Sequence, residues 1–266
     1  MTGAWDDAVG GPPGVHPRVH PPCTSAVPGA HATEPDALSG NWRRFFFLST
    51  SPNLTGPAPR RTARILQHGC GSLLEGLTFK VANACERGLA FEFRRVVYEE
   101  QFGHLPIDDL DELAHHLVAT NENGEIIAAV RIVGPDQRPF DLERYVELAQ
   151  FIPKERIPAM IGRFCIRRDY RGVSKRSFVP MGMFKLSYAF ARQQGLTDLL
   201  TYAYRNLYHF YRGAFFEPMI RGFDHPTWGT VTVMRLDLDG LEARYRESKQ
   251  PFAHFLLRAK LPNILL

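Results

Sequence analysis

The sequence lacks several features that would assign it to a specialised class of protein. Its 266 residues contain no run of about 18 apolar residues, so no membrane-spanning helix is predicted. The N-terminal residues do not follow the basic, then apolar, then small-residue order of a secretory signal peptide. The motifs H-E-x-x-H, G-x-S-x-G and the P-loop are missing, and no internal repeat is visible. These absences argue against zinc proteases, serine hydrolases, P-loop nucleotidases and solenoids.

Cysteine and net charge are both modest. The four cysteines form no C-x-x-C pair, and a chain of this length does not need disulfide staples, so we expect reduced thiols and a cytoplasmic location. No metal site is expected. The net charge of +4 is well short of that of a nucleic-acid-binding tail, so no nucleic-acid partner is expected.

Proline is unevenly distributed along the chain. Ten of the 20 prolines precede residue 60, in a stretch without apolar periodicity that cannot bury enough surface to offset its ordering entropy. We therefore predict a largely disordered extension over residues 1–76 and a folded domain over residues 77–266. The apolar, basic segment Asn41–Thr50 is predicted to pack on that domain or to contact a membrane surface.

Beyond residue 77 the hydrophobic periodicity alternates between strand and helix types. A hairpin is predicted around Asn123-Gly124, whose residues suit a turn with positive φ. The expected strands cover 77–83, the two arms of the hairpin within 115–134, 160–170, 196–204 and 230–238. The expected helices cover 85–103, part of 141–153, 179–194, 206–216 and the region from Leu241 onward. This order predicts an α/β fold with a mixed central sheet and helices on both faces.

Two charged runs could form binding sites. The first follows the strand at 160–170 and contains six basic residues and one acid: Arg163, Arg167, Arg168, Arg171, Lys175, Arg176 and Asp169. It leads into a helix, so its backbone N–H groups and side chains could bind a phosphate-bearing ligand or an acidic protein surface, or be a solvated loop. The second run is acidic, includes Asp108 and Asp111, and could hold an ammonium or a guanidinium group or simply cap a short helix.

Histidine and tyrosine supply further candidates. His115 and His116 are adjacent in a predicted strand, so they point to opposite faces and cannot easily share a metal ion. Tyr208 and Tyr211 lie on one face of a predicted helix. Tyr211 could donate a proton to a departing thiolate, although core packing explains it about equally well. Cys165 lies between Phe and Ile on a predicted strand and is expected to be a buried small hydrophobe.

The order of elements and motifs over residues 77–240 resembles the GNAT acyltransferase fold. In that fold a strand ending in an Arg-Gly loop leads into a helix that cradles a pantetheine pyrophosphate, and IRRDYRG at 166–172 matches this approach. The following VSKRSF departs from the family's glycine-rich continuation, which weighs against ordinary acetyl-CoA binding. The segment from Asn206 to Phe215 resembles the family's Asn and Tyr-x-x-x-Gly-Phe region, which implies that Tyr211 is the acid for the leaving thiolate.

A closer resemblance is to the acyl-homoserine lactone synthases and the long-chain N-acyl amino acid synthases. RRVVYEEQFG, DDLDE, AAVRIV and MIGRFCI stand in the order of the family's motifs and place Arg131 and Arg163 at its two arginine positions. Met160 stands where the lactone synthases have Glu, so the N-acyl amino acid synthases are the better match. The resemblance implies transfer of a long acyl chain from acyl carrier protein, or from acyl-CoA, to an amino acid, with no permanently bound cofactor.

Site roles follow from this resemblance. The stretch Phe164, Cys165, Ile166 and Arg167 would present the backbone N–H that polarises the thioester carbonyl, which is typically worth about 3 kcal/mol. The phosphate side of the donor would be bound by Arg171, Gly172, Lys175, Arg176 and Asn206. A side chain must also take the proton of the amine, and the candidates are Glu99, Asp111 and His116.

Two other functions stay open at the level of the sequence. The chain could be an acetyl-CoA-dependent N-acetyltransferase of the same fold. It could also be a GNAT-like module without activity, whose basic loop binds an acidic partner.

Overall fold

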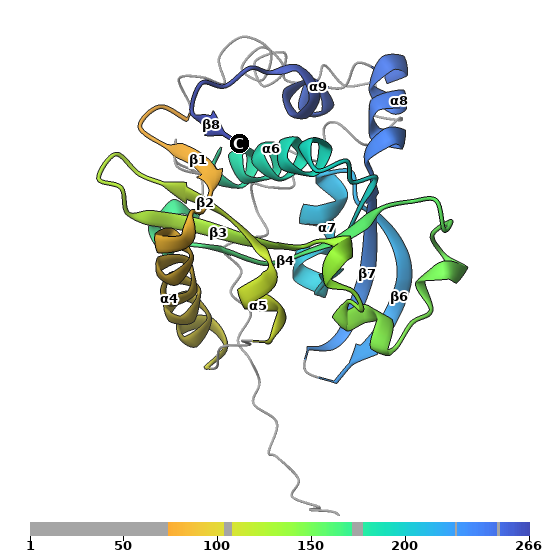
Figure 1. Cartoon of the computed structure of the whole chain (residues 1–266). Helices are drawn as coiled ribbons and strands as arrows, with labels where there is room; N and C mark the ends of the chain where they lie inside the picture. The colour runs from red at the N-terminus through yellow and green to blue at the C-terminus, as the bar shows by residue number, and fades with distance from the viewer. Residues whose placement is uncertain (1–73, 104–107, 172–177, 227, 249–250) are drawn as a thin grey trace, which may run out of the picture. The chain divides into compact units, whose positions relative to one another are not determined.

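The computed structural model describes residues 74–103, 108–171, 178–226, 228–248 and 251–266 (Figure 1). All of them fall within one compact unit, Asp36–Leu266. The expected extension over residues 1–76 lies almost wholly outside the described residues, as do the segment Asn41–Thr50 and three of the predicted donor-binding residues, Gly172, Lys175 and Arg176. Those expectations remain predictions.

A mixed sheet of eight strands forms the centre of the described part. The strands are β1 (Thr78–Val81), β2 (His115–Thr120), β3 (Ile126–Val133), β4 (Pro158–Ile166), β5 (Asp198–Ala203), β6 (Glu217–His225), β7 (Gly229–Asp237) and β8 (Ile264–Leu265). They are ordered β6-β7-β5-β4-β3-β2-β1-β8. The pairs β4–β5 and β1–β8 are parallel and the other pairs are antiparallel. The predicted α/β class with a mixed sheet is confirmed.

Helices cover both faces of this sheet (Figure 1). They are α4 (Ala84–Phe102), α5 (Leu110–Leu113), α6 (Val179–Gln193), α7 (Arg205–Gly213), α8 (Leu238–Ser248) and α9 (Pro251–Arg258). Helices α4 and α5 pack on one side, here called the α4 face, and α6 packs on the other, called the α6 face, with α9 against it. Short 3-10 turns at Pro135–Gln137, Asp141–Arg144, Leu148–Gln150 and Arg168–Tyr170 complete the connections.

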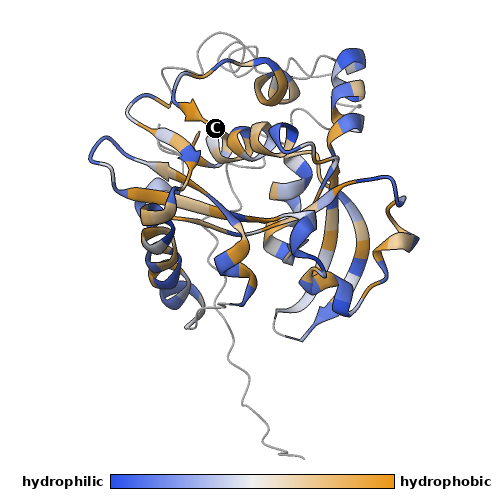
Figure 2. Cartoon of the chain, viewed as in Figure 1, coloured by the Kyte–Doolittle hydropathy of each residue, from blue (hydrophilic) through white to orange (hydrophobic). Residues whose placement is uncertain are grey.

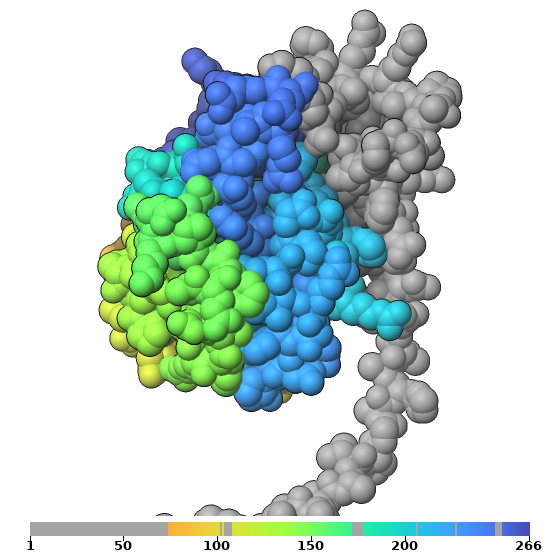
Figure 3. Space-filling view, turned by 90° about the vertical axis from the view of Figure 1, so that its right-hand side faces the viewer, coloured from red at the N-terminus to blue at the C-terminus, as the bar shows by residue number. Residues whose placement is uncertain are grey.

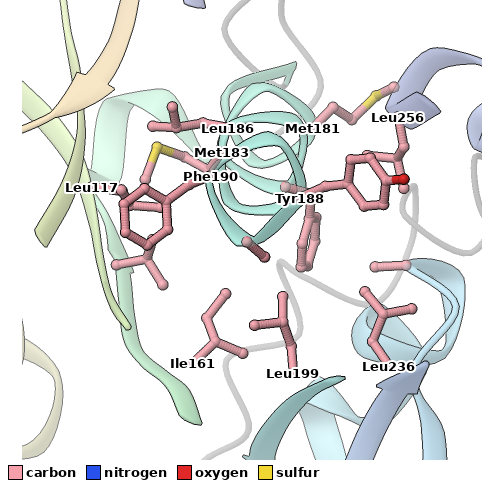
Figure 4. Close-up of a cluster of buried hydrophobic side chains, with 14 of the residues drawn as sticks. Leu117, Ile161, Met181, Met183, Leu186, Tyr188, Phe190, Leu199, Leu236 and Leu256 are labelled. Carbon is pink, nitrogen blue, oxygen red and sulfur yellow. The ribbon is translucent and has the colours of Figure 1, made fainter. Parts of the chain in front are cut away.

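The residues of strand β3 are buried on both faces of the sheet. Ala128, Val130 and Ile132 belong to the apolar cluster beneath α6, whereas Ala129 and Val133 belong to two clusters on the α4 face. This period of two is that of a regular strand. Figure 4 shows α6 above this core, with Leu186 and Phe190 on the helix and Ile161, Leu199 and Leu236 on the strands below.

Helix α4 is apolar on one side only, and both of its ends carry helix-capping residues. Asn83 and Glu86 form a reciprocal capping box, and Gly103 ends the helix at φ 71°. Hydrophilic residues dominate its outer side in Figure 2, while Ala90 and Val97 are buried against the sheet.

Several details differ from the sequence predictions. The expected helix within 141–153 is two 3-10 turns, because its buried residues Leu142, Leu148 and Ile152 do not follow a helical stripe. Strand β6 was not predicted, since its exposed residues and two register shifts disguise any alternation. The C-terminal helix is split into α8 and α9. In the β2–β3 turn only Gly124 has a positive φ, and the side chain of Asn121 closes the loop.

Candidate active site

Strands β4 and β5 separate in the middle of the sheet. They pair only from Pro158–Asp198 to Met160–Leu200. Beyond this point β4 continues to Ile166 against β3, and β5 continues to Ala203 against β7. The two central strands therefore open a wedge between them, and residues Gly162 to Phe164 of an interior strand are only half-buried.

The closed end of the wedge is held by an ion-pair network. Arg156 precedes β4, and its Nε lies 2.7 Å from Oδ2 of the fully buried Asp198 on β5. Its Nη2 lies 2.7 Å from Asp237 Oδ1 on β7, and Arg235 Nε lies 2.6 Å from Asp198 Oδ1. Because one guanidinium ties three segments together, the strands are fixed at this end and free to diverge at the other.

A β-bulge lies in β4 at the wedge. Between the pairs Arg131–Gly162 and Ala129–Cys165, β4 has one residue more than β3, and Arg163 adopts φ 56°. A positive φ is unfavourable for a residue with a Cβ, and such bulges re-aim side chains. Here the bulge places Arg163 on the α4 face, although Ile161 and Phe164 on either side of it belong to the α6 face.

A cluster of arginines and aspartates occupies the α4 face beside the wedge. Arg94 Nη2 lies 2.7 Å from Asp111 Oδ1, and Arg131 Nη1 lies 3.0 Å from the same oxygen. Arg131 also bonds Asp108 Oδ1 at 2.5 Å, and Arg163 Nη2 bonds Asp108 Oδ2 at 2.7 Å. Three guanidinium groups thus face two carboxylates, so this arginine–aspartate cluster carries an excess positive charge.

The cluster also has unused hydrogen-bond donors. The Nε and Nη1 atoms of Arg94 and the Nε atoms of Arg131 and Arg163 are buried without a partner among the described residues. Arg94 is only 1% exposed. A buried charge without compensation is costly, so donors of this kind favour an incoming anion. Of the two cations expected for the acidic run, Asp108 and Asp111 bind guanidinium groups, those of the chain's own arginines.

The opposite wall of the wedge on the α4 face is aromatic. The Arg163 guanidinium lies 4.7 Å from the ring centre of Trp228, in the turn between β6 and β7. His225 at the end of β6 contacts Tyr202 of β5, and its Nε2 lies 2.9 Å from Asp141 Oδ2. Figure 3 shows the segment that contains Asp141 packed against the β6–β7 hairpin. At Gly162 of β4 an added Cβ would meet no atom within 4 Å.

On the α6 face the wedge is lined by aromatic rings. Phe164 stacks on Phe184 of α6 with 5.8 Å between ring centres and lies 5.7 Å from Phe210 of α7. Tyr211 is buried beside Phe184, and burial raises the pKa of its phenol while a hydrogen bond with Thr201 opposes this shift. A phenol with a raised pKa stays protonated at neutral pH, as a proton donor to a thiolate requires.

Part of the predicted basic run lies in the described residues that follow β4. Arg171 is half-buried, its Nε donates to the Ile166 carbonyl at 2.5 Å, and burial lowers its pKa. Arg167 is compensated by Glu125 and Asp169. Asn206 lies in the first turn of α7. The described donor-side residues Phe164, Ile166, Arg167 and Arg171 therefore follow one another along the edge of the wedge.

The structure gives each of the three residues predicted as bases a hydrogen-bond or ionic partner. Glu99 is on the surface and pairs with Arg95 at 2.7 Å. Asp111 accepts from Arg94 and Arg131. His116 is buried, its Nε2 lies 2.8 Å from the Asp111 carbonyl oxygen, and burial lowers its pKa to about 4. The assignment of a base among these three residues stays a prediction.

Two neighbouring predictions are tested by the same geometry. His115 contacts Phe190 on the α6 face and His116 contacts Phe91 on the α4 face, so the expected opposite orientation is confirmed. Cys165 is buried under α4, and burial raises the pKa of its thiol to about 12, as expected for an unreactive residue. Within the described ranges, no group of three or more potential metal ligands comes together, and no helix is long and apolar enough to cross a membrane.

Comparison with known proteins agrees with this geometry. Residues 92–179, which include Arg94, Arg131 and Arg163, match the family described as acetyltransferase (GNAT) domain. The chain has the GNAT fold. The structure of FeeM, an N-acyl amino acid synthase from uncultured soil microbes, is similar with a TM-score of 0.52 and 17% identity over 61% of this chain and 90% of that one.

A second GNAT-fold structure is that of BjaI, a CoA-dependent acyl-homoserine lactone synthase. It has a TM-score of 0.50 and 17% identity, covering 72% of this chain and 93% of that chain. No curated protein sequence matches significantly. The resemblance stated from the sequence motifs, to the GNAT fold and to these two kinds of synthase, is thus found again in the structural comparison.

Sequence reasoning did not single out Arg94, Asp141, His225 or Trp228 as site residues. Arg94 was visible within the motif RRVVYEEQFG, but nothing distinguished it from the exposed Arg95 beside it. Asp141, His225 and Trp228 come from a 3-10 turn and an unpredicted hairpin, so no local pattern marks them.

Proposed function

We propose that this GNAT-fold protein is an N-acyltransferase that moves an acyl group from a thioester to the amino group of an amine that carries a carboxylate, such as an amino acid. The proposal rests on one observation: the open β4–β5 wedge carries an excess of positive charge on its α4 face. A wedge in the centre of a sheet gives two substrates access to each other from opposite faces.

The donor would enter along the α6 face. Arg171 lies just beyond the end of β4, where its guanidinium would attract an anionic phosphate or an acidic carrier protein. The thioester would then reach the backbone of Phe164 and Cys165 beside the bulge, where an N–H could polarise its carbonyl. Acyl carrier protein and acyl-CoA share the phosphopantetheine arm that this path would accept, and the motifs favour the carrier protein.

The acceptor would bind on the α4 face. Its carboxylate would complete the arginine–aspartate cluster by accepting from Arg163 and its neighbours, and its amine would face the wedge. The amine nitrogen forms a bond to the carbonyl carbon, the C–S bond breaks, and the thiolate takes a proton from Tyr211. Holding the two reactants together can contribute about 7 to 11 kcal/mol in favourable cases.

The direct test is thiol release combined with mass spectrometry of the products. Purified protein is mixed with dodecanoyl-acyl carrier protein, dodecanoyl-CoA or acetyl-CoA and a pool of the twenty amino acids. Formation of an N-dodecanoyl amino acid supports the proposal and identifies both donor and acceptor. Acetylation alone would indicate an ordinary acetyltransferase, and no product from any donor would contradict enzymatic function.

Replacement of Arg163 tests the carboxylate site. We expect Arg163→Ala to lower kcat/KM for amino acids about 100-fold, because a charge-assisted hydrogen bond to the carboxylate is lost, while the amides of the same amino acids lose much less. Arg95→Ala is the control, since Arg95 is exposed on α4 and pairs with Glu92 and Glu99 on the surface of that helix. Equal losses for acids and amides would show that Arg163 does not bind the carboxylate.

A further inference from the structure

The aromatic side of the wedge on the α4 face carries a carboxylate that no arginine or lysine neutralises among the described residues. This is Asp141, at the start of a 3-10 turn, with its side chain 29% exposed. Its ionic partner is His225, whose ring is almost completely buried. The wall is continuous with the wedge, because His225 packs against Trp228 and Trp228 covers Arg163.

The hydrogen bonds of His225 determine how it holds Asp141. The backbone N–H of Trp228 donates to His225 Nδ1 at 3.3 Å. In a neutral imidazole the other nitrogen then carries the proton, so Nε2–H donates to Asp141 Oδ2 at 2.9 Å. His225 thus holds Asp141 through Oδ2. Tyr202 lies beside the same carboxylate, and burial, the charge of Asp141 and a hydrogen bond with it raise the pKa of the Tyr202 phenol.

We propose that Asp141, positioned by His225, binds the amino group of the acceptor and takes its proton during acyl transfer. This inference rests on the proposed N-acyltransferase function. It assigns the two charged groups of an amino acid to two parts of the α4 face beside the wedge, the carboxylate to the arginine–aspartate cluster and the amino group to Asp141.

The step balances without any further reactant. The nitrogen lone pair forms the C–N bond to the thioester carbonyl, and the nitrogen of the tetrahedral intermediate then carries a positive charge. One of its protons passes to the Asp141 carboxylate as the C–S bond breaks. The thiolate is protonated by Tyr211. Asp141 then gives its proton to water, and the Tyr211 phenolate regains one from water, so both groups return to their starting state.

The test uses the full chain with dodecanoyl-acyl carrier protein or dodecanoyl-CoA and the amino acid pool. Asp141→Asn keeps the shape of the side chain but cannot take a proton, so we expect kcat/KM to fall about 100-fold, in line with the usual loss of a general base. Asp141→Ala should lose as much and regain a part of its rate when formate is added, because formate can occupy the vacated position and accept the proton.

Two further variants test whether His225 positions Asp141 and whether a loss of rate reflects structural damage. His225→Gln should lower kcat less than Asp141→Asn, since the glutamine amide can still donate to Asp141. Asp136→Asn alters an exposed acid of the preceding 3-10 turn and should leave the rate unchanged. Melting temperatures of all variants establish that they fold.

The outcomes separate this inference from the function on which it rests. If the wild-type protein forms no acyl amide from any donor, the proposed function fails. If the wild type is active and Asp141→Asn keeps its rate, Asp141 is not the proton acceptor. If Asp141→Asn loses activity but formate does not restore Asp141→Ala, the role of the residue is structural and the inference is overturned.

Discussion

At the scale of the residue, burial decides the chemistry of the ionisable groups more than their identity does. His116 was a reasonable candidate base in the sequence because histidine titrates near neutral pH. The structure buries it against Phe91 and the Asp111 backbone, where the charged form is disfavoured. Arg163 and Asp108 were each singled out from a charged run, but the pairing between them and the contact of Arg163 with Trp228 were beyond local patterns.

The lowered pKa of His116 predicts acid sensitivity. The pKa is about 4 in the folded protein and 6.5 in the unfolded chain, so the unfolded chain binds more protons between these values. The free energy of unfolding should therefore fall by up to about 3 kcal/mol as pH drops from 6.5 to 4. Denaturant unfolding of wild type and His116→Gln across this range measures the effect. An equal loss in the variant would show that other groups are responsible.

At the scale of the element, long periodic segments were predictable and irregular ones were not. Helices α4 and α6 and strands β3, β5 and β7 were recognised because a stripe or an alternation of apolar residues extends over several turns or pairs. The bulge in β4 was not, because nothing in MIGRFCI reveals an extra residue between two hydrogen-bonded pairs. The wedge was likewise not predictable, because it depends on where the pairing of β4 with β5 ends.

The packing of α6 gives a prediction at this scale. Helix α6 crosses β1 at Gly182, where an added Cβ would overlap the ring of Phe79, a fully buried side chain. Gly182→Ala should therefore lower the free energy of unfolding by about 1 to 3 kcal/mol through overpacking. Its control is Gly88→Ala on the exposed side of α4, where nothing lies within 4 Å of the new methyl group.

The two alanine variants should have opposite effects in the same unfolding experiment. Gly88→Ala should raise stability by roughly 0.5 to 1 kcal/mol, because alanine favours the helix and meets no steric obstacle. If Gly182→Ala is instead as stable as the wild type, the close approach of α6 to β1 is not required by the fold.

At the scale of the whole molecule, the sheet divides the two halves of the proposed reaction. Aromatic and apolar side chains meet the wedge on the α6 face, while a charged cluster and the Asp141–His225 pair meet it on the α4 face. The class of fold and the order of the motifs were predictable from the sequence. The charge balance of the cluster was not, because it requires Arg94, Asp108, Asp111, Arg131 and Arg163 to come together from four separate segments.

The most direct measurement of the central claim is a structure of the complex with an acyl-CoA analogue, in which a methylene group replaces the thioester sulfur, together with an amino acid. The account predicts that the acyl carbonyl lies between β4 and β5 against residues 162–165. It also predicts the amino acid on the α4 face, with its carboxylate at Arg163 and its nitrogen at Asp141. An analogue bound away from the wedge, or an amino acid bound on the α6 face, would contradict it.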